Sequence, residues 1–202
     1  MTTADRPRRG RPRDPHIEDR VFDAVMHVFW ETGWSAFTLD AVARRAGVGR
    51  EALYRRWPSK EALLLQALEA KGPLARPIDT GTLRGDLVEL CSQMLREFRG
   101  HAGLVALRAA LDARVYPDLL HQLTTSVQAD RIGAAREIYA RAKSRGELPR
   151  RADTNELLEM LSGAVMSHVL FSYRPNDMTD PAADRRYVDR IVNLNLHAAT
   201  LT

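Results

Sequence analysis

Residues 38–60 read TLDAVARRAGVGREALYRRWPSK, a pattern that predicts two short helices joined by a glycine turn. Thr38 is a good N-cap for the first helix, because its hydroxyl can accept a hydrogen bond from a free amide of the first turn. Gly47 can end that helix in the left-handed conformation. The second helix carries an apolar side that ends at Trp57, and the proline that follows disfavours further helix.

The second helix leaves charged and aromatic side chains on its outer side. These outward positions are Arg50, Glu51, Tyr54, Arg55 and Arg56. A helix of this length is not stable alone in water, so it needs a partner that braces it. A braced short helix that presents arginines and a tyrosine fits a helix-turn-helix reader of the DNA major groove.

Positive charge is concentrated in the first third of the chain. The 202 residues carry a formal net charge of +4, and residues 1–60 hold twelve Arg and Lys against eight Asp and Glu. The remaining residues hold 18 of each sign. We therefore expect a polyanionic partner for the first third and an uncharged task for the rest.

The sequence offers little for catalysis. The lone cysteine, Cys91, lies on an apolar helical stripe, the six histidines show no metal-ligand spacing, and no glycine-rich phosphate loop is present. We expect no catalytic residue, no metal site and no cofactor.

The basic start is not followed by the apolar run of a signal peptide. The longest uncharged run, Met160 to Tyr173, is shorter than the ~20 apolar residues of a membrane span. These features predict a cytoplasmic protein with no membrane partner.

Residues 1–15 are rich in Arg and Pro and lack apolar periodicity, which predicts a flexible basic arm. Its core, Arg9-Gly10-Arg11-Pro12, resembles an AT-hook, in which extended arginines lie in the narrow A·T minor groove. The alternative is a solvated basic tail that touches phosphates without sequence preference.

The region around the helix pair resembles a known family. A helix with an apolar stripe is expected from about Pro15 to Thr32, and Gly33 ends it. The sequence continues with GW at 33–34, FT at 37–38, VARRAGV at 42–48, LYRRW at 53–57 and SKEAL at 59–63. These motifs, in this order, closely resemble the N-terminal DNA-binding domain of TetR-family transcriptional regulators over about residues 16–65. Gly49 departs from the family pattern, since many members carry a Ser or Thr hydroxyl there.

The resemblance implies DNA contacts for matching positions. Arg50 and Glu51 would reach base edges, because Arg can donate two bonds to guanine and Glu can accept from cytosine. Tyr54, Thr38 and Lys60 would contact the backbone, with Lys60 at the N-terminus of the next helix. The alternative for each arginine is a solvated charge or a salt bridge to a nearby carboxylate such as Asp40. The predicted DNA-binding residues are Arg9, Arg11, Thr38, Arg44, Gly49, Arg50, Glu51, Tyr54, Arg55, Arg56 and Lys60.

The rest of the chain predicts only helices. A helix from Ser59 to Lys71 is followed by a candidate linker over residues 72–82. Further helices are expected over residues 82–98, 104–115, 117–145, 157–173 and 181–199. The predicted fold is all-α with about nine helices. It comprises the arm at 1–15, a three-helix helix-turn-helix domain at 16–65, and a C-terminal helical bundle at 66–202.

The last two helices predict a homodimer. Residues 160–173 carry no charge, and a helix that is apolar all round is buried all round, so its second side should meet another subunit. The last helix shows the 4-3-4 spacing of helix-on-helix packing. Family resemblance implies the same dimer, which an operator with two half-sites requires. The alternative is a monomer. The predicted interface residues are Met160, Gly163, Ala164, Phe171, Tyr187, Ile191, Leu194 and Ala198.

The resemblance also implies a small-molecule effector bound among the C-terminal helices. The candidate lining residues mix large apolar side chains with a few polar ones, which suits an uncharged or aromatic ligand. They are Met94, Phe98, Leu107, Leu111, Tyr116, His121, Tyr139, Met166 and His168. Ordinary core packing is the alternative for each.

The predicted function is sequence-specific transcriptional regulation by a dimer. We expect a repressor that a small, mostly apolar ligand releases from its palindromic operator. An architectural DNA-binding protein with a solid helical core is the alternative, and it would show no operator preference. An enzyme with a DNA-binding appendage would need a clustered polar site that the sequence does not show.

Overall fold

The computed structural model describes residues 16–72, 77–171 and 180–201, without the side chains of 119–132 and 201. Within these ranges the chain forms nine helices and no strand, which confirms the all-α prediction. The helices are α1 Ile17–Ala36, α2 Leu39–Ala46, α3 Arg50–Arg56, α4 Lys60–Lys71, α5 Leu83–Arg99, α6 His101–Asp112, α7 Pro117–Ser144, α8 Thr154–Phe171 and α9 Pro181–Leu201. None of the helices in the described ranges combines the length and the apolar composition that crossing a membrane requires.

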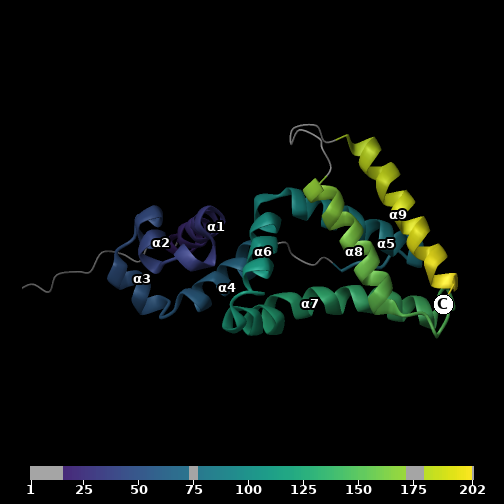
Figure 1. Cartoon of the computed structure of the whole chain (residues 1–202), viewed down its shortest axis with the longest axis horizontal. Helices are drawn as coiled ribbons and strands as arrows, with labels where there is room; N and C mark the ends of the chain where they lie inside the picture. Colours follow the sequence, from purple (N-terminus) through teal and green to yellow (C-terminus); the bar gives the residue numbers. More distant parts are fainter. Residues whose placement is uncertain (1–15, 73–76, 172–179, 202) are drawn as a thin grey trace, which may run out of the picture.

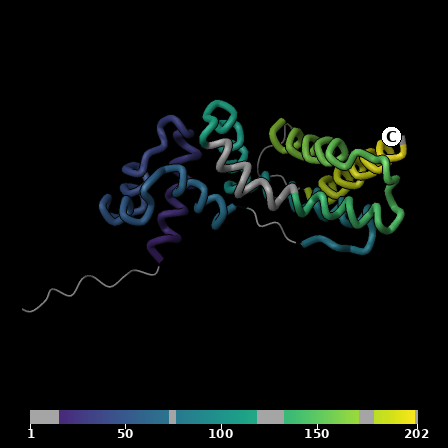
Figure 2. Tube along the Cα trace, turned by 90° about the horizontal axis from the view of Figure 1, so that it is seen from below, coloured from purple at the N-terminus to yellow at the C-terminus, as the bar shows by residue number. Residues whose placement is uncertain are grey.

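The molecule is elongated, and a different group of helices forms each of its two ends (Figures 1 and 2). Helices α1 to α4 gather at one end, with α3 at the tip. Helices α5, α8, α9 and the second half of α7 form a bundle at the other end, where α5 packs against both α8 and α9. Helix α6 stands between the two groups and packs against α1, α4 and α5.

The first hydrophobic core lies among α1 to α4 and includes one side of α6. Its buried residues include Phe29 and Phe37 from α1 and the segment after it, Leu53 from α3, and Val105 and Ala109 from α6. The inner side of α6 therefore belongs to the core formed by α1 to α4, although α6 lies beyond the predicted linker.

Local capping forms the helix pair as the sequence predicts. The Thr38 hydroxyl accepts from the Ala41 amide at 3.2 Å, and the Ser59 hydroxyl accepts from the Ala62 amide at 3.1 Å. Gly47 ends α2 with φ 66°, in the left-handed region that glycine adopts without strain.

Some predicted helix boundaries are wrong. Helix α1 does not stop at Thr32: Gly33 breaks it with φ 67° and ψ 179°, and the chain then resumes as helix to Ala36. Helix α6 begins three residues before the predicted position, directly after Gly100. Helix α8 begins at Thr154 because the Asp153 carboxylate accepts from the amides of its first turn.

The break in α1 is bridged by two side chains of α6. In an unbroken helix the Trp34 amide would donate to the Trp30 carbonyl. Instead, the Trp34 amide donates to Asp112 Oδ2 at 2.8 Å, and the Trp30 carbonyl accepts from Arg108 Nη1. Both halves of the missing helical hydrogen bond are thus satisfied by α6.

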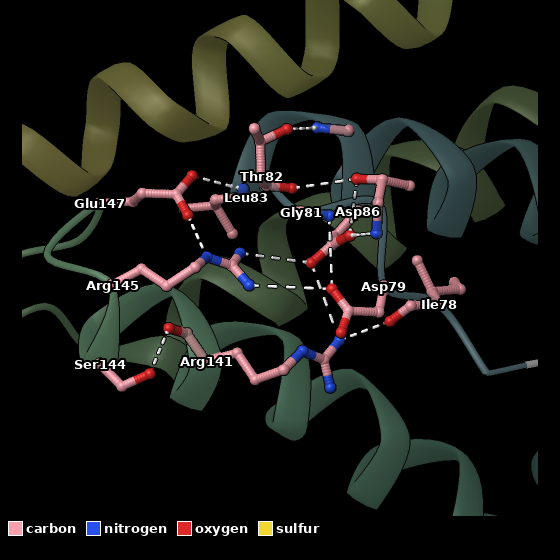
Figure 3. Close-up of polar contacts among 12 residues, drawn as sticks. Ile78, Asp79, Gly81, Thr82, Leu83, Asp86, Arg141, Ser144, Arg145 and Glu147 are labelled. Atoms are coloured by element: carbon pink, nitrogen blue, oxygen red, sulfur yellow. Dashed lines mark hydrogen bonds and ion pairs between the residues drawn. The ribbon is translucent and has the colours of Figure 1, made fainter.

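A buried carboxylate fixes the start of α5 against the end of α7 (Figure 3). Asp86 is fully buried, and its Oδ1 accepts from the Thr80 amide at 2.6 Å and the Thr80 hydroxyl at 2.7 Å. Its Oδ2 lies 3.5 Å from Arg145 Nη2 and 3.7 Å from Arg141 Nη2. Charge therefore anchors the chain entering the C-terminal bundle to the end of α7, and Arg141 of α7 also donates to the Ile78 carbonyl.

The second core fills the C-terminal bundle. Its buried residues come from α5, α7, α8 and α9 and from the segment between α7 and α8. The Tyr139 hydroxyl donates to Asn195 Oδ1 at 3.3 Å, and Asn195 Nδ2 donates to the Leu157 carbonyl at 2.7 Å. This chain of hydrogen bonds joins α7, α9 and α8 inside an otherwise apolar core.

Candidate nucleic-acid interface

Helix α3 is anchored on one side and exposed on the other. Leu53 and Trp57 are buried, and the Trp57 indole N–H donates to Gln66 Oε1 of α4 at 2.8 Å. The Phe22 ring of α1 meets the Trp57 ring edge-on, with centroids 5.9 Å apart. This anchoring holds the outer side of α3 toward solvent at the tip of the molecule (Figure 1).

The predicted DNA-binding residues of α3 are all exposed. Arg50, Glu51, Tyr54, Arg55 and Arg56 are exposed, as is Arg44 on α2. Gly49 precedes α3 without any side-chain cap. The predicted residues of α2 and α3 are thus accessible to a partner, whereas Arg9 and Arg11 lie outside the described residues.

Carboxylates hold two of these arginines. Arg50 Nη2 forms an ion pair with Asp40 Oδ2, and the Tyr54 hydroxyl donates to Asp40 Oδ1 at 3.4 Å. Arg56 pairs with Glu18 of α1 at 2.5 Å. No ion pair of Arg44 or Arg55 is found among the described side chains. Arg50 therefore forms the salt bridge to Asp40 that was considered as an alternative.

The side chain of Lys60 makes its contacts within the protein, with two backbone carbonyls and an aromatic ring. Its amine donates to the Trp34 carbonyl at 3.1 Å and to the Phe37 carbonyl at 3.4 Å, and it stands 4.0 Å from the centroid of the Trp34 ring. The charge thus ties α4 to the end of α1. Contacts of Lys60 and Thr38 with a phosphate remain predictions.

The predicted dimer surface contains large apolar side chains that this chain leaves uncovered. Met160, Phe171 and Leu194 are 53%, 79% and 62% exposed, respectively. A side chain at Gly163 would meet open space. Helix α9 turns a different row toward its own core, and these buried residues are Val188, Val192, Asn195 and Ala199. The predicted row at Tyr187, Ile191, Leu194 and Ala198 lies one residue away, on the flank and outer side of the helix.

A hollow of about 420 Å³ lies on the same α8–α9 surface. It is lined by Ala164, Ser167, His168, Phe171 and Tyr187. The rings of His168 and Tyr187 stack with centroids 3.8 Å apart, and the Tyr187 hydroxyl donates to the Ala164 carbonyl at 2.7 Å. His168 thus faces the candidate dimer surface.

Of the predicted ligand-lining residues, His168 alone lines this hollow in the described part of the chain. Tyr139 is buried in the second core, and Met94 and Phe98 are half-buried against it. Leu111 is 63% exposed, whereas Tyr116 packs on the first core beside Trp34. Leu107 and Met166 are half-buried, and the side chain of His121 lies outside the described residues.

Reactive groups are scarce in the described residues. Cys91 is fully buried, and burial raises the pKa of its thiol to about 12, so the thiolate is not formed at neutral pH. Over the same residues, no cluster of three or more His, Cys, Asp or Glu side chains could hold a metal ion.

Comparison with known proteins matches both ends of the molecule. Residues 21–67 match the family model described as "Bacterial regulatory proteins, tetR family". Residues 77–194 match "Tetracyclin repressor-like, C-terminal domain". The chain belongs to the TetR family. It is a DNA-binding transcriptional regulator, as the proteins of that family are.

Curated TetR-family relatives span most of the chain. An uncharacterised HTH-type transcriptional regulator of Mycobacterium tuberculosis strain H37Rv is 33% identical over 174 residues, which cover 85% of each chain. The regulator AqdR of Rhodococcus erythropolis is 30% identical over 162 residues, covering 80% of this chain and 78% of AqdR.

A solved structure shares the fold at low sequence identity. The transcriptional regulator FadR of Bacillus subtilis, determined in complex with stearoyl-CoA, aligns with a TM-score of 0.68 at 17% identity. The alignment covers 88% of this chain and 97% of FadR.

Sequence reasoning did not find the residues that support the reading surface. Asp40 was considered only as an alternative partner for an arginine, and Glu18 was not linked to any arginine. Arg108 and Asp112 of α6 were not singled out. Their four-residue spacing places them on one side of a helix, but nothing local indicates that this side faces a break in α1.

Proposed function

We propose that this protein is a dimeric repressor that reads a palindromic operator with α3 of each subunit. The observation that carries the proposal is the outer side of α3, where Arg50, Tyr54, Arg55 and Arg56 are exposed while Leu53 and Trp57 anchor the helix. A short anchored helix with this surface fits the major groove, and phosphates attract its charge.

Dimerisation through α8 and α9 completes the proposal. Two half-sites one helical turn apart need two reading heads at a fixed spacing. The outer surface of α8 and α9, with Met160, Phe171 and Leu194 exposed, supports this arrangement, because large exposed apolar groups favour contact with another protein surface. The small residues Gly163 and Ala164 would let a second copy of α8 approach closely.

A small, mostly apolar effector is proposed to release the operator. The fold shared with FadR, which was determined with stearoyl-CoA, suggests acyl-CoA esters as a first class of probe. Helix α6 offers a route for the signal, because it contacts α5 of the bundle and bonds to the α1 break through Arg108 and Asp112. A ligand acts through such a route only if it binds one arrangement of α6 better than the other.

The test is a DNA-binding assay with the full chain. The DNA flanking its own gene is compared with a scrambled duplex of equal length and composition, each titrated at two salt concentrations. We expect a retarded complex on the flanking DNA that persists at the higher salt, and its loss on adding stearoyl-CoA or another member of a panel of apolar acids and aromatic compounds. Equal affinity for both duplexes would instead favour the architectural alternative.

A further inference from the structure

We propose that Asp40 is a specificity-determining positioning residue, whose carboxylate orients Arg50 and Tyr54 for reading bases. This inference rests on the proposed function, because it requires a DNA sequence that the chain prefers. Asp40 lies on α2, the helix that packs against α3.

The geometry places one carboxylate between two outward side chains. Asp40 lies in the first turn of α2, its Oδ2 pairs with Arg50 Nη2, and its Oδ1 accepts from the Tyr54 hydroxyl at 3.4 Å. Arg50 and Tyr54 are four residues apart on α3 and therefore share one side of that helix. Each oxygen of Asp40 serves one of them.

Arg50 depends on this contact for its orientation. Its side chain is 68% exposed, and it begins a helix whose N-cap, Gly49, provides no side-chain hydrogen bond. An unrestrained arginine loses rotamer freedom when it docks on a base, and restraint beforehand reduces that loss. The guanidinium has five N–H donors, so one pair can reach guanine O6 and N7 while Asp40 holds another.

The charge of Asp40 also acts against incorrect sites. A carboxylate near the groove is repelled by phosphates, which weakens binding wherever Arg50 finds no guanine to compensate. The same group therefore lowers affinity for arbitrary DNA and sharpens the preference for one base pair.

The neighbouring ion pairs have a different geometry. Glu31 and Glu18, both on α1, pair with Arg45 at 3.0 Å and Arg56 at 2.5 Å, and so tie α2 and α3 to the scaffold. Glu31 touches none of the predicted DNA-binding residues. Glu31→Gln removes the same charge from the same domain and serves as the matched control for Asp40→Asn.

The experiment selects duplexes from a randomised pool with the wild-type chain and then measures affinities for the preferred site, its single-base variants and a scrambled duplex. For Asp40→Asn we expect a several-fold rise in affinity for scrambled DNA. We also expect an about tenfold loss of discrimination at one base pair per half-site. Glu31→Gln should change all affinities by a common factor. Helical content and thermal unfolding of each variant confirm that it is folded.

A double-variant cycle separates positioning from simple charge removal. In the Arg50→Ala background, Asp40→Asn should cause no further loss of discrimination at that base pair, because its effect passes through Arg50. The role of Asp40 is overturned if Asp40→Asn changes the affinities for preferred and scrambled DNA by equal factors. It is also overturned if Asp40→Asn still reduces discrimination in the Arg50→Ala background. Neither result would contradict the proposed function. A wild-type chain that selects no sequence overturns the proposed function as well.

Discussion

The backbone amide of Trp34 in α1 donates to the carboxylate of Asp112 in α6, at 2.8 Å and across 78 residues of sequence. The Trp30 carbonyl, which that amide would contact in a continuous helix, accepts from Arg108 one turn earlier on α6. Helix α6 thus supplies a donor and an acceptor in place of one helical hydrogen bond. The DNA-reading end and the C-terminal bundle are joined at the break in α1 by directional bonds as well as by apolar packing.

The conformation of Gly33 makes this junction possible. Its φ of 67° with ψ 179° lies in a region that is almost exclusive to glycine. A Cβ atom there would also stand 2.5 Å from Arg108 Nη2. We expect Gly33→Ala to lower the free energy of unfolding by about 3 kcal/mol, combining backbone strain with displacement of Arg108. Urea unfolding followed by circular dichroism measures it.

Gly47→Ala is the matched control for this prediction. Gly47 has nearly the same φ, 66°, but its added Cβ would meet nothing within 4 Å, and the expected cost is about 1–2 kcal/mol. In an Arg108→Ala background the cost of Gly33→Ala should fall toward the Gly47 value. Equal costs for the two glycines in the wild-type background would contradict the steric role of Arg108.

Removing the acceptor at Asp112 should leave a buried donor without a partner. Trp34 is 7% exposed, so its amide cannot readily bond to water after Asp112→Ala. We expect a loss of about 1–3 kcal/mol in the free energy of unfolding. Asp112→Asn keeps an acceptor oxygen in place and should cost clearly less. The interpretation fails if the asparagine and alanine variants are equally destabilised.

Asp86 should make the protein sensitive to acid. Burial by itself raises the pKa of this carboxyl, but the hydrogen bonds from Thr80 and the charges of Arg141 and Arg145 outweigh it and leave the pKa below its ordinary value of 3.8. A lowered folded-state pKa stabilises the fold above the unfolded-state pKa, and that contribution disappears as the pH falls through the folded-state value. Wild-type unfolding curves should therefore lose more stability below about pH 4 than those of Asp86→Asn.

Asp86→Asn should itself be less stable at neutral pH, since Arg141 and Arg145 would face a neutral amide. Unfolding free energies measured between pH 7 and pH 3 test both statements. Parallel pH profiles for the two proteins would show that other carboxylates dominate the acid response.

The parts of the fold that local chemistry determines could be predicted from the sequence. Thr38 and Ser59 cap the helices that they were expected to cap, and Gly47 ends α2 as expected, because each effect involves residues within one turn. Gly33 was correctly located as a break. The sequence could not show that the helix resumes after it, since the bonds that satisfy the broken turn come from Arg108 and Asp112.

The predicted ligand-lining set shows where periodicity stops being informative. Leu111 follows the apolar pattern near the end of α6, yet its side chain is exposed, whereas Tyr116, just before α7, packs on the first core. One side of α6 packs on the first core, and the apolar spacing of the helix does not indicate which of its residues lie on that side. The last helix likewise carries two adjacent rows that are mostly apolar, and their spacing does not indicate which row faces the chain's own core.

The outer row of α9 provides a direct test of the dimer. Leu194 is 62% exposed in the single chain and lies in the surface that we propose as the subunit contact. Leu194→Arg would place two symmetry-related charges in that contact, and we expect the dimer dissociation constant to rise about 100-fold or more. Leu111→Arg is a closely matched control, because Leu111 is 63% exposed but lies on α6. Sedimentation velocity over a range of concentrations should show a dimer for wild type and Leu111→Arg, and a monomer for Leu194→Arg. A monomeric wild type, or a dimer that tolerates the change at Leu194 but not at Leu111, would place the subunit contact elsewhere.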